Sequence, residues 1–423
     1  MKITKIETIW FEPQSREQWE AAKAQTRQAM PNNLFVRIHT DNGLSGLGET
    51  YYLPRAVSSI IHDVCAPLLI GRDPLDIENH WNNLFSLVNF CGAAGAEMRA
   101  ISALDVALWD IAGQAAGQPI YNMLGGRSRD RIPIYNTCVS SGKYQDLQMS
   151  LDGRAGELAQ DLLKQGISAM KLWPFDRFAS TLAGPNNPRG KVIMWGGETA
   201  AGVLSHSISN EDLKHGIAVV EQIRRAVGDK MSIAIEGHAR WDLPTATRIA
   251  RALEPYDILW LEEIMPPDNV DAYVRLKAAT KVPICQSERV FTRFNFRHWI
   301  EKNAADIIMP DLSWGGGITE GRKIAAMADT YYLPVTCHDT IGPVALWAAM
   351  HLMLHIPNAL IMETVRGYLD GWYRDVVTDD LPLSDGHLSL PNKPGLGTRL
   401  RDELLARPDA RVEVTTERDV RTW

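Results

Sequence analysis

The sequence predicts an α/β protein in which a parallel α/β barrel follows a smaller α+β domain. Three short apolar runs each end in a carboxylate, at Glu236, Glu262 and Glu288, and these glutamates are 26 residues apart both times. Each interval also contains a helix-like segment, 243–253 in the first and 271–280 in the second. One strand, one helix and two loops fill an interval of this length, so the pattern indicates three consecutive βα units.

Further strand-like runs extend this pattern to eight. All but the first of the eight end in, or carry near their end, a charged or titratable residue; the added runs are 132–135, 169–173, 306–309, 334–337 and 360–362. In a parallel barrel the C-terminal ends of the strands meet at one face, and that face carries the active site. Ordinary solvated loops do not explain such regularity, so we expect these side chains to converge.

The rest of the chain divides around this barrel. Residues 1–128 combine strand-like alternation with helical periodicity, and Asp41-Asn42-Gly43 is a strong hairpin signal, so they predict an α+β domain. Within it, residues 13–33 are polar and look mobile. We predict the barrel at 129–365 and expect residues 366–423 to return to the first domain and complete it.

Composition limits the function classes. A net charge of −7 over 423 residues disfavours nucleic acid or an anionic membrane as a partner. The opening residues resemble a strand and not a signal peptide, and the longest apolar stretch, 344–354, is too short to span a bilayer. The five cysteines are scattered, with no CxxC pair. We therefore expect a cytoplasmic protein with reduced thiols.

The three glutamates predict a metal site. Three carboxylates at successive strand ends would repel one another unless a cation joined them. An all-oxygen site suits Mg²⁺, with Mn²⁺ second. The alternative is three ordinary exposed loop glutamates, which the equal spacing disfavours.

Three other groups near the strand ends are candidates for acid–base chemistry. Asp311 and His338 lie 27 residues apart at the ends of adjacent predicted strands, and a carboxylate beside an imidazole raises its basicity, which makes a general base. An isolated strand-end histidine is more often structural. His238, two residues after Glu236, could be a metal ligand, a second acid or base, or a loop residue. Lys171 faces either the carboxylates or an anionic substrate, or it is a solvated lysine at a strand end.

Two irregular segments complete the candidate site. Residues 174–209 form a long loop rich in Gly, Pro and Asn, and we expect a lid or specificity element there, with Trp173 and Trp195 walling the pocket. The run Gly315-Gly316-Gly317 is neither a GxGxxG nor a Walker pattern, so it predicts a turn into the helix that follows from residue 318.

These motifs together resemble the enolase superfamily, in its mandelate racemase/muconate-lactonizing branch. The resemblance covers nearly the whole chain and rests on the three glutamates, the His338 strand and the segments 103–110, 124–126, 310–311 and 316–320. It implies a modified (β/α)₇β TIM barrel under an α+β capping domain. It also implies one Mg²⁺ per subunit on Glu236, Glu262 and Glu288, a substrate carboxylate bound to that metal, loss of the α-proton to a base, and a homo-oligomer (dimer or octamer).

Two departures from the branch refine the resemblance. Its racemases carry Lys-x-Lys on the second strand, whereas this chain has Lys171-Leu172-Trp173, which disfavours a racemase that uses two bases from these strands. Glu236-Gly237-His238 is similar to the Asp-x-His of galactonate and mannonate dehydratases, with Glu in place of Asp. The resemblance therefore implies a dehydratase of an acid sugar, an aldonate or an aldarate.

The expected roles follow from this resemblance. Either histidine could serve as the acid for the β-hydroxyl, and the resemblance favours His238 as the base and His338, paired with Asp311, as the acid on the opposite face of the substrate. Lys171 is expected to hold the substrate carboxylate. Glu363 is expected to hydrogen-bond the enediolate or a hydroxyl. A racemase or epimerase that uses both histidines and a cycloisomerase with an apolar cavity remain alternatives. A non-catalytic binding protein would have lost a metal ligand or the Asp311–His338 pair, and neither is lost.

Overall fold

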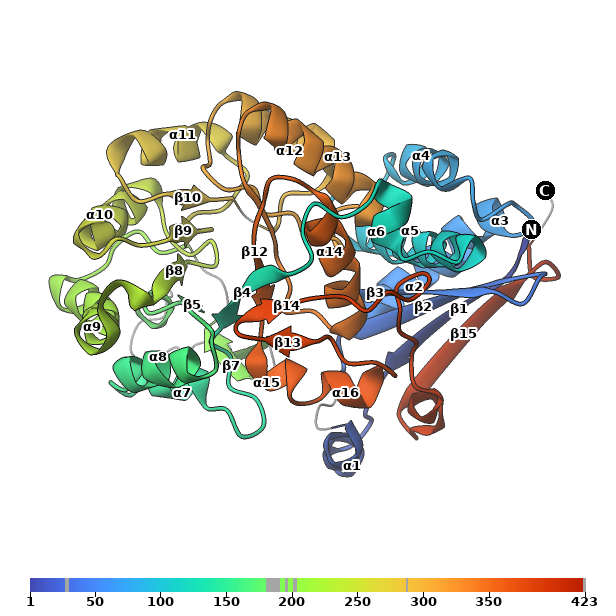
Figure 1. The fold of residues 1–423 in the computed structure, drawn as a ribbon, viewed down its shortest axis with the longest axis horizontal. Helices are drawn as coiled ribbons and strands as arrows, with labels where there is room; N and C mark the ends of the chain where they lie inside the picture. The colour runs from blue at the N-terminus through green and yellow to red at the C-terminus, as the bar shows by residue number, and fades with distance from the viewer. Residues whose placement is uncertain (27–29, 180–190, 195–196, 201–203, 287, 421–423) are drawn as a thin grey trace. The chain divides into compact units, whose positions relative to one another are not determined.

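The computed structural model describes residues 1–26, 30–179, 191–194, 197–200, 204–286 and 288–420 (Figure 1). The chain divides into two compact units. The first consists of Met1–Pro133, Glu288–Phe296 and Pro310–Trp423, and the second of Ile134–Ser287 and Arg297–Met309.

The first unit contains a four-stranded antiparallel sheet in the order β15-β1-β2-β3. Its strands are β1 (Ile3–Phe11), β2 (Asn33–Thr40), β3 (Ser45–Tyr51) and β15 (Ala410–Thr416). The predicted hairpin at Asp41-Asn42-Gly43 is confirmed, since β2 and β3 pair around it and Gly43 takes the left-handed φ of 85° that such a turn requires. The C-terminal strand β15 pairs with β1 along seven residues of each strand.

The long helix α5 (Ala96–Ala116) packs closely on this sheet. Its apolar residues between 98 and 113 are buried, as the i, i+3, i+4 spacing predicted. Glycine is required at two positions of β3, because a Cβ on Gly46 or Gly48 would lie 1.9 Å from the carbonyl oxygen of Ala107 or Ala103. The close approach therefore depends on two residues that have no side chain.

The same unit also contains two parallel strands, β11 (Val335–Cys337) and β12 (Ala359–Thr364), with helices α13 (Gly317–Thr330) and α14 (Pro343–His355). The glycine run forms the predicted turn, with Gly316 as the left-handed residue before α13. The largely apolar helix α14 is buried from Pro343 to Leu354, which explains why its sequence shows no polar face.

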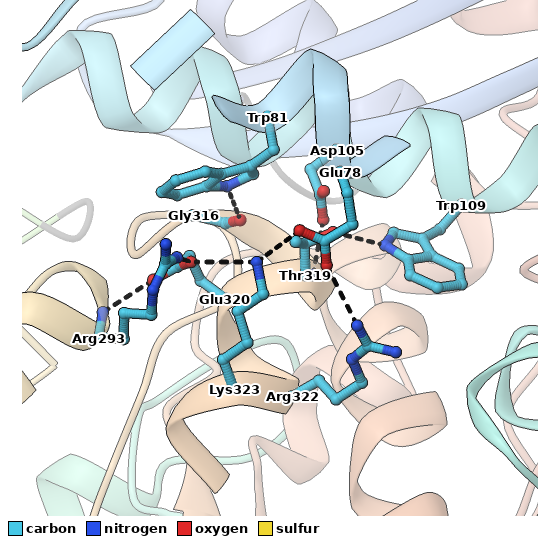
Figure 2. A network of polar contacts seen from close by, with 10 residues as sticks. All are labelled: Glu78, Trp81, Asp105, Trp109, Arg293, Gly316, Thr319, Glu320, Arg322 and Lys323. Atoms are coloured by element: carbon cyan, nitrogen blue, oxygen red, sulfur yellow. Dashed lines mark hydrogen bonds and ion pairs between the residues drawn. The ribbon is translucent and has the colours of Figure 1, made fainter. Parts of the chain in front are cut away.

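A polar network joins α5 to the start of α13 (Figure 2). The backbone N–H of Thr319 donates to Asp105 Oδ2 at 3.0 Å, and Trp109 Nε1 donates to the Thr319 hydroxyl at 2.9 Å. Gly316 is bonded on both sides, because its N–H donates to Ser102 Oγ at 2.8 Å and its carbonyl accepts from Trp81 Nε1 at 2.9 Å. These hydrogen bonds thus join the segments 103–110 and 316–320, which carry much of the family resemblance. We call this contact the joint between α5 and α13.

Ion pairs extend the network along α13, as Figure 2 shows. Glu320 is fully buried and pairs with Arg293, whose own N–H donates to it at 2.8 Å. Glu78, on α4 (Ile77–Val88), accepts from Arg322 at 3.1 Å and from Lys323 at 2.6 Å. Glu320 thus has a cation beside it, as a buried carboxylate requires in surroundings of low polarity.

The second unit contains a parallel sheet with helices beside it, which confirms the predicted α/β class. Its strands pair in chain order: β4 (Ile132–Thr137), β5 (Ala169–Leu172), β8 (Ser232–Glu236), β9 (Trp260–Glu262) and β10 (Ile284–Cys285). Figure 1 shows α9 (Asn210–Val227), α10 (Leu243–Leu253) and α11 (Val270–Ala279) along the outer side of these strands. Helix α10 has the bounds that the sequence predicted.

The sixth predicted strand, 306–309, is wrong as a ladder strand. Ile307 makes only an isolated bridge with Cys285. The next ladder position is taken by a side chain, because Met309 N–H donates to Gln286 Oε1 at 3.0 Å. The side chain of the buried Gln286 thus takes the place of a backbone partner and ends the regular pairing. The apolar periodicity of a sequence cannot show such a replacement.

Two segments contain more structure than their composition indicated. The polar segment 13–33 includes a helix, α1 (Arg16–Thr26), and the long loop 174–209 includes a short 3₁₀ helix, η2 (Asp176–Phe178). A hairpin of β6 (Lys191–Met194) and β7 (Gly197–Ala200) also lies in that loop. The expectation of a lid stays a prediction, because much of the loop lies outside the described residues.

The remaining elements are short. The α-helices are α2 (Pro54–Ser59), α3 (Ala66–Leu69), α6 (Ile120–Leu124), α7 (Asp146–Leu151), α8 (Ala155–Lys164), α12 (Thr292–Glu301), α15 (Arg366–Leu369) and α16 (Tyr373–Val376). The others are the π-helix η1 (Ile60–Cys65), the 3₁₀ helices η3 (Gly228–Lys230), η4 (Glu254–Tyr256) and η5 (Asp402–Ala406), and the strands β13 (Leu383–Ser384) and β14 (His387–Leu388). No helix in the described part of the chain is long and apolar enough to cross a membrane. All five cysteines are free thiols.

Asp105 makes stability depend on pH. Burial raises its pKa from 3.8 to about 7, although the bonds from Thr319 oppose this. The protonated acid therefore favours the folded state fully below about pH 4, and this contribution is lost as the pH rises through 7. The side chain introduced by Asp105→Asn is neutral at every pH. Between pH 4 and 8 the free energy of unfolding of this variant should therefore change less than that of the wild type. The difference should be a few kcal/mol, at about 1.4 kcal/mol per pKa unit.

Urea unfolding at a series of pH values measures this difference. The exposed Asp76 of the same unit supplies the control, since Asp76→Asn should follow the wild-type curve. Parallel curves for Asp105→Asn and the wild type would show that Asp105 does not titrate on unfolding.

Candidate active site

In the second unit, three of the predicted residues lie together. Glu236 and Glu262 end the adjacent strands β8 and β9 and are direct partners in the parallel register. Lys171, on β5, lies between them, with its Nζ 2.6 Å from Glu262 Oε1 and 3.1 Å from Glu236 Oε2. All three side chains are buried, so the alternatives of exposed loop glutamates and a solvated lysine do not apply to these residues.

The ammonium group of Lys171 decides the charge of this cluster. Burial opposes ionisation of Glu236, but Lys171, and His238 after it, hold the pKa of Glu236 below its ordinary value. Glu262 also accepts a hydrogen bond from Trp260 Nε1 at 2.8 Å. Glu236 is thus kept ionised by a cation that it shares with Glu262.

His238 follows β8 and forms a pair that the sequence did not reveal. Its Nδ1 lies 2.6 Å from Oδ2 of Asp176, and Arg240 Nε lies 3.0 Å from the same oxygen. Trp173 packs edge-on against the imidazole, with ring centroids 5.6 Å apart. Asp176 lies in the loop after β5, where no periodic pattern in the sequence marks it. Its position, four residues after the strand that carries Lys171, is the one sequence feature that could have indicated it.

In the first unit, Asp311 and His338 form the predicted pair. His338 Nδ1 lies 2.6 Å from Asp311 Oδ2, and both side chains are buried. The other oxygen of Asp311 accepts from the backbone N–H groups of Ser313 at 2.7 Å and Trp314 at 3.1 Å. The carboxylate is therefore held from both sides, which fixes the orientation of the ring.

The electrostatic surroundings of His338 favour its charged form. Burial lowers the pKa, but the Glu363 carboxylate, the bond to Asp311 and the charge of Glu288 together raise it to about 9. Glu363, at the end of β12, is fully buried and accepts from the N–H of Asp339 at 2.8 Å. His338 is therefore an imidazolium at neutral pH in these surroundings.

Aromatic and cationic residues surround this pair, and the sequence analysis missed two of them, Trp314 and Arg99. The Trp314 ring lies 5.2 Å from the His338 ring, and the Arg99 guanidinium lies 4.2 Å from the Trp314 centroid. Tyr52 approaches the same indole at 5.7 Å. Of the two predicted tryptophans, Trp173 touches a site histidine, whereas Trp195 lies outside the described residues.

The chemistry of the donor set in the second unit fits a hard cation. Glu236 and Glu262 offer carboxylate oxygens, the ligands that Mg²⁺ prefers, at a place where Lys171 already supplies positive charge. Within the described ranges, no group of three or more His, Cys, Asp or Glu residues forms a metal-binding cluster.

Family models and solved structures identify the relatives of this chain. Residues 5–125 match the mandelate racemase/muconate lactonizing enzyme N-terminal domain, and residues 154–404 match the enolase C-terminal domain-like family. A crystal structure of an enolase of the mandelate racemase subgroup from Agrobacterium tumefaciens is 39% identical, with a TM-score of 0.83, and the match covers 99% of this chain and 100% of that one. This likeness confirms the predicted barrel with its capping domain.

Two curated relatives are similar along most of their length. The D-galactonate dehydratase of Pectobacterium atrosepticum is 34% identical over 96% of this chain and 94% of its own. The D-xylonate dehydratase of Haloferax volcanii is 33% identical over 87% of this chain and 83% of its own. The chain therefore belongs to the enolase superfamily, in the mandelate racemase/muconate lactonizing enzyme branch, as its motifs predicted.

Proposed function

We propose that the chain is a hydro-lyase that removes water from a sugar acid, an aldonate or an aldarate, to give a 2-keto-3-deoxy acid. The observation that carries the proposal is that two histidines, His238 and His338, are each bonded through Nδ1 to an aspartate. Elimination of water needs a base for the α-proton and an acid for the β-hydroxyl, and two such pairs supply both. The relatives named D-galactonate and D-xylonate dehydratase support this choice of reaction.

The two histidines have different tasks in this proposal. His238 takes the α-proton at Nε2, and the electrons of the C–H bond pass into the substrate carboxylate to give an enediolate. In the next step these electrons form the carbon–carbon double bond as the β C–O bond breaks. His338 gives its proton to the departing hydroxyl, which leaves as water, and the enol product rearranges to the 2-keto acid. The raised pKa of His338, about 9, supports the role of acid, because the group carries a proton at neutral pH.

Other residues bind and orient the substrate. Lys171 is proposed to hold the substrate carboxylate and so to favour the charge that develops when the α-proton leaves. Glu363 is proposed to bond the enediolate or a hydroxyl, and Trp173 to form a wall beside His238. We also propose Trp195 as a wall of the pocket, and this proposal rests on the sequence alone. We further propose that the enzyme is cytoplasmic and homo-oligomeric.

One Mg²⁺ per subunit is proposed on Glu236, Glu262 and Glu288. The buried pair of glutamates and their oxygen donors support the first two ligands, and the equal spacing along the sequence supports the third. When bound, Mg²⁺ would stabilise the negative charge on the substrate carboxylate during proton removal.

The metal proposal predicts the effect of Glu262→Gln. The amide carries no charge, so Mg²⁺ affinity should fall by about 10-fold or more in calorimetric titration, and turnover should nearly vanish. Glu301→Gln, on the exposed surface of α12, is the matched control and should bind Mg²⁺ as the wild type does. Wild-type turnover that persists in excess EDTA would contradict a metal-dependent reaction.

Removal of Lys171 tests the charge balance without any substrate. In EDTA, Lys171→Met leaves two buried carboxylates without their cation, so the free energy of unfolding should fall by about 3–5 kcal/mol. Lys302→Met removes an ion-paired lysine that is 46% exposed and should cost about 1 kcal/mol or less. Mg²⁺ should raise the melting temperature of Lys171→Met more than that of the wild type, and an equal rise would argue against a cation near this cluster.

Isotope exchange assigns the histidines. Purified protein with Mg²⁺ is first screened against a library of aldonates and aldarates for 2-keto-3-deoxy products. With the substrate found, His238→Asn should lose α-proton exchange in deuterium oxide, whereas His338→Asn should keep exchange and lose elimination. Dehydration by His338→Asn at the wild-type rate would refute its role, and an epimer as the only product would favour the racemase or epimerase alternative.

A further inference from the structure

Asp176 is a buried carboxylate that no motif of the sequence pointed to. It lies in η2, after β5, and is 8% exposed, while His238 lies 62 residues later, after β8. The 2.6 Å between Asp176 Oδ2 and His238 Nδ1 equals the distance between Asp311 and His338. The second unit thus repeats, with residues from other strands, the pairing found in the first.

The contact determines which nitrogen of His238 carries the hydrogen in the neutral ring. An ionised carboxylate only accepts hydrogen bonds, so Nδ1 must carry the hydrogen that is donated to Asp176. In the neutral ring Nε2 is then the nitrogen without a hydrogen, and it is the atom that can take a proton. Arg240 Nε lies 3.0 Å from the same Asp176 oxygen, so this oxygen contacts both the imidazole and the guanidinium.

The backbone around His238 is held in an unfavourable conformation. His238 has a φ of 46° and Ala239 a φ of 57°, two successive left-handed residues that are not glycine. Such conformations cost on the order of 1 kcal/mol each and persist where neighbouring bonds fix them. Three backbone bonds do so here: Gly237 N–H to Glu262 O at 2.9 Å, Ala239 N–H to Glu263 O at 2.6 Å and Trp241 N–H to Ile264 O at 3.1 Å.

The imidazole is fixed on two sides but is not enclosed. Asp176 holds its Nδ1, and Trp173 packs edge-on against the ring at 80°. The His238 side chain is still 27% exposed, whereas the His338 side chain is 5% exposed. A ring that is held in one orientation and yet reachable can exchange a proton with a bound molecule.

We propose that Asp176 is a positioning residue that fixes the tautomer and orientation of His238, so that Nε2 is presented to the α-proton of the substrate. This inference rests on the proposed function, in which His238 is the base. The competing explanation is a structural ion pair, in which Asp176 serves only to neutralise Arg240 and the contact with His238 has no part in the reaction.

The first experiment measures kinetics on the sugar acid found in the screen. Asp176→Asn keeps the size of the side chain, but its amide can donate to Nδ1 and reverse the tautomer. We expect kcat for α-proton exchange to fall on the order of 10²- to 10⁴-fold, with KM within about threefold of the wild type, and Asp176→Glu to recover part of the loss. Asp311→Asn should show the opposite pattern, in which exchange is kept and elimination is lost.

The chain offers a matched control for the chemical change. Asp242 also contacts a histidine, His206, at 3.1 Å, but that histidine side chain is 71% exposed. Asp242→Asn should therefore leave both rates as in the wild type. An unchanged kcat in Asp176→Asn would overturn the proposal, and a rise in KM alone would show that Asp176 shapes binding and does not position the base.

A second experiment reads the tautomer directly and needs no turnover. Long-range ¹H–¹⁵N spectra of histidine-labelled protein with Mg²⁺, recorded over a pH series, identify the neutral ring and show which of its nitrogens carries the hydrogen. His238→Gln assigns the signal. We expect hydrogen on Nδ1 in the wild type and on Nε2 in Asp176→Asn. Hydrogen on Nε2 in the wild type would overturn the proposal even if Asp176→Asn failed to fold.

The two experiments separate this inference from the function on which it rests. If no sugar acid is dehydrated by the wild type, the proposed function fails, while the spectra still decide whether Asp176 sets the tautomer. If the wild type dehydrates its substrate and Asp176→Asn does so equally well, the function stands and the inference fails.

Discussion

Buried negative charge is the constraint on which the structure depends. The strand ends and the loops after them carry carboxylates that are almost fully removed from water, among them Glu236, Glu262 and Asp311. Low polarity makes an isolated carboxylate costly, so each must have a cation or a set of donors. Lys171 serves the two glutamates, while a histidine and two backbone N–H groups serve Asp311. The side chains that satisfy the charge are the same ones to which the chemistry is assigned.

This pairing gives the two histidines different characters. His338 is enclosed and surrounded by acids, which favours a proton that stays on the ring until it is passed on. His238 is more exposed, and the aspartate that it contacts also contacts Arg240. Two groups of one chemical type thus lie in different surroundings, and the proposed division into one acid and one base depends on such a difference.

The sequence revealed those parts of the site that follow the periodicity of the fold. The 26-residue interval placed Glu236 and Glu262 on neighbouring strands, and the 27-residue interval placed Asp311 beside His338, because a βα unit has a nearly constant length. Asp176 could not be found in this way, since its contact depends on the path of a loop. The segment 306–309 failed for a related reason, because one side-chain bond from Gln286 replaced the ladder that its apolar run predicted.

The joint between α5 and α13 limits how such proteins can exchange parts during evolution. A Cβ on Gly317 would lie 2.2 Å from Asp105 Oδ2, so neither segment can change its shape alone. A recombination event that joined residues 1–128 of one relative to the remainder of another would bring together halves that had not been selected for each other. Segments 102–110 and 315–320 should therefore be inherited as a matched pair.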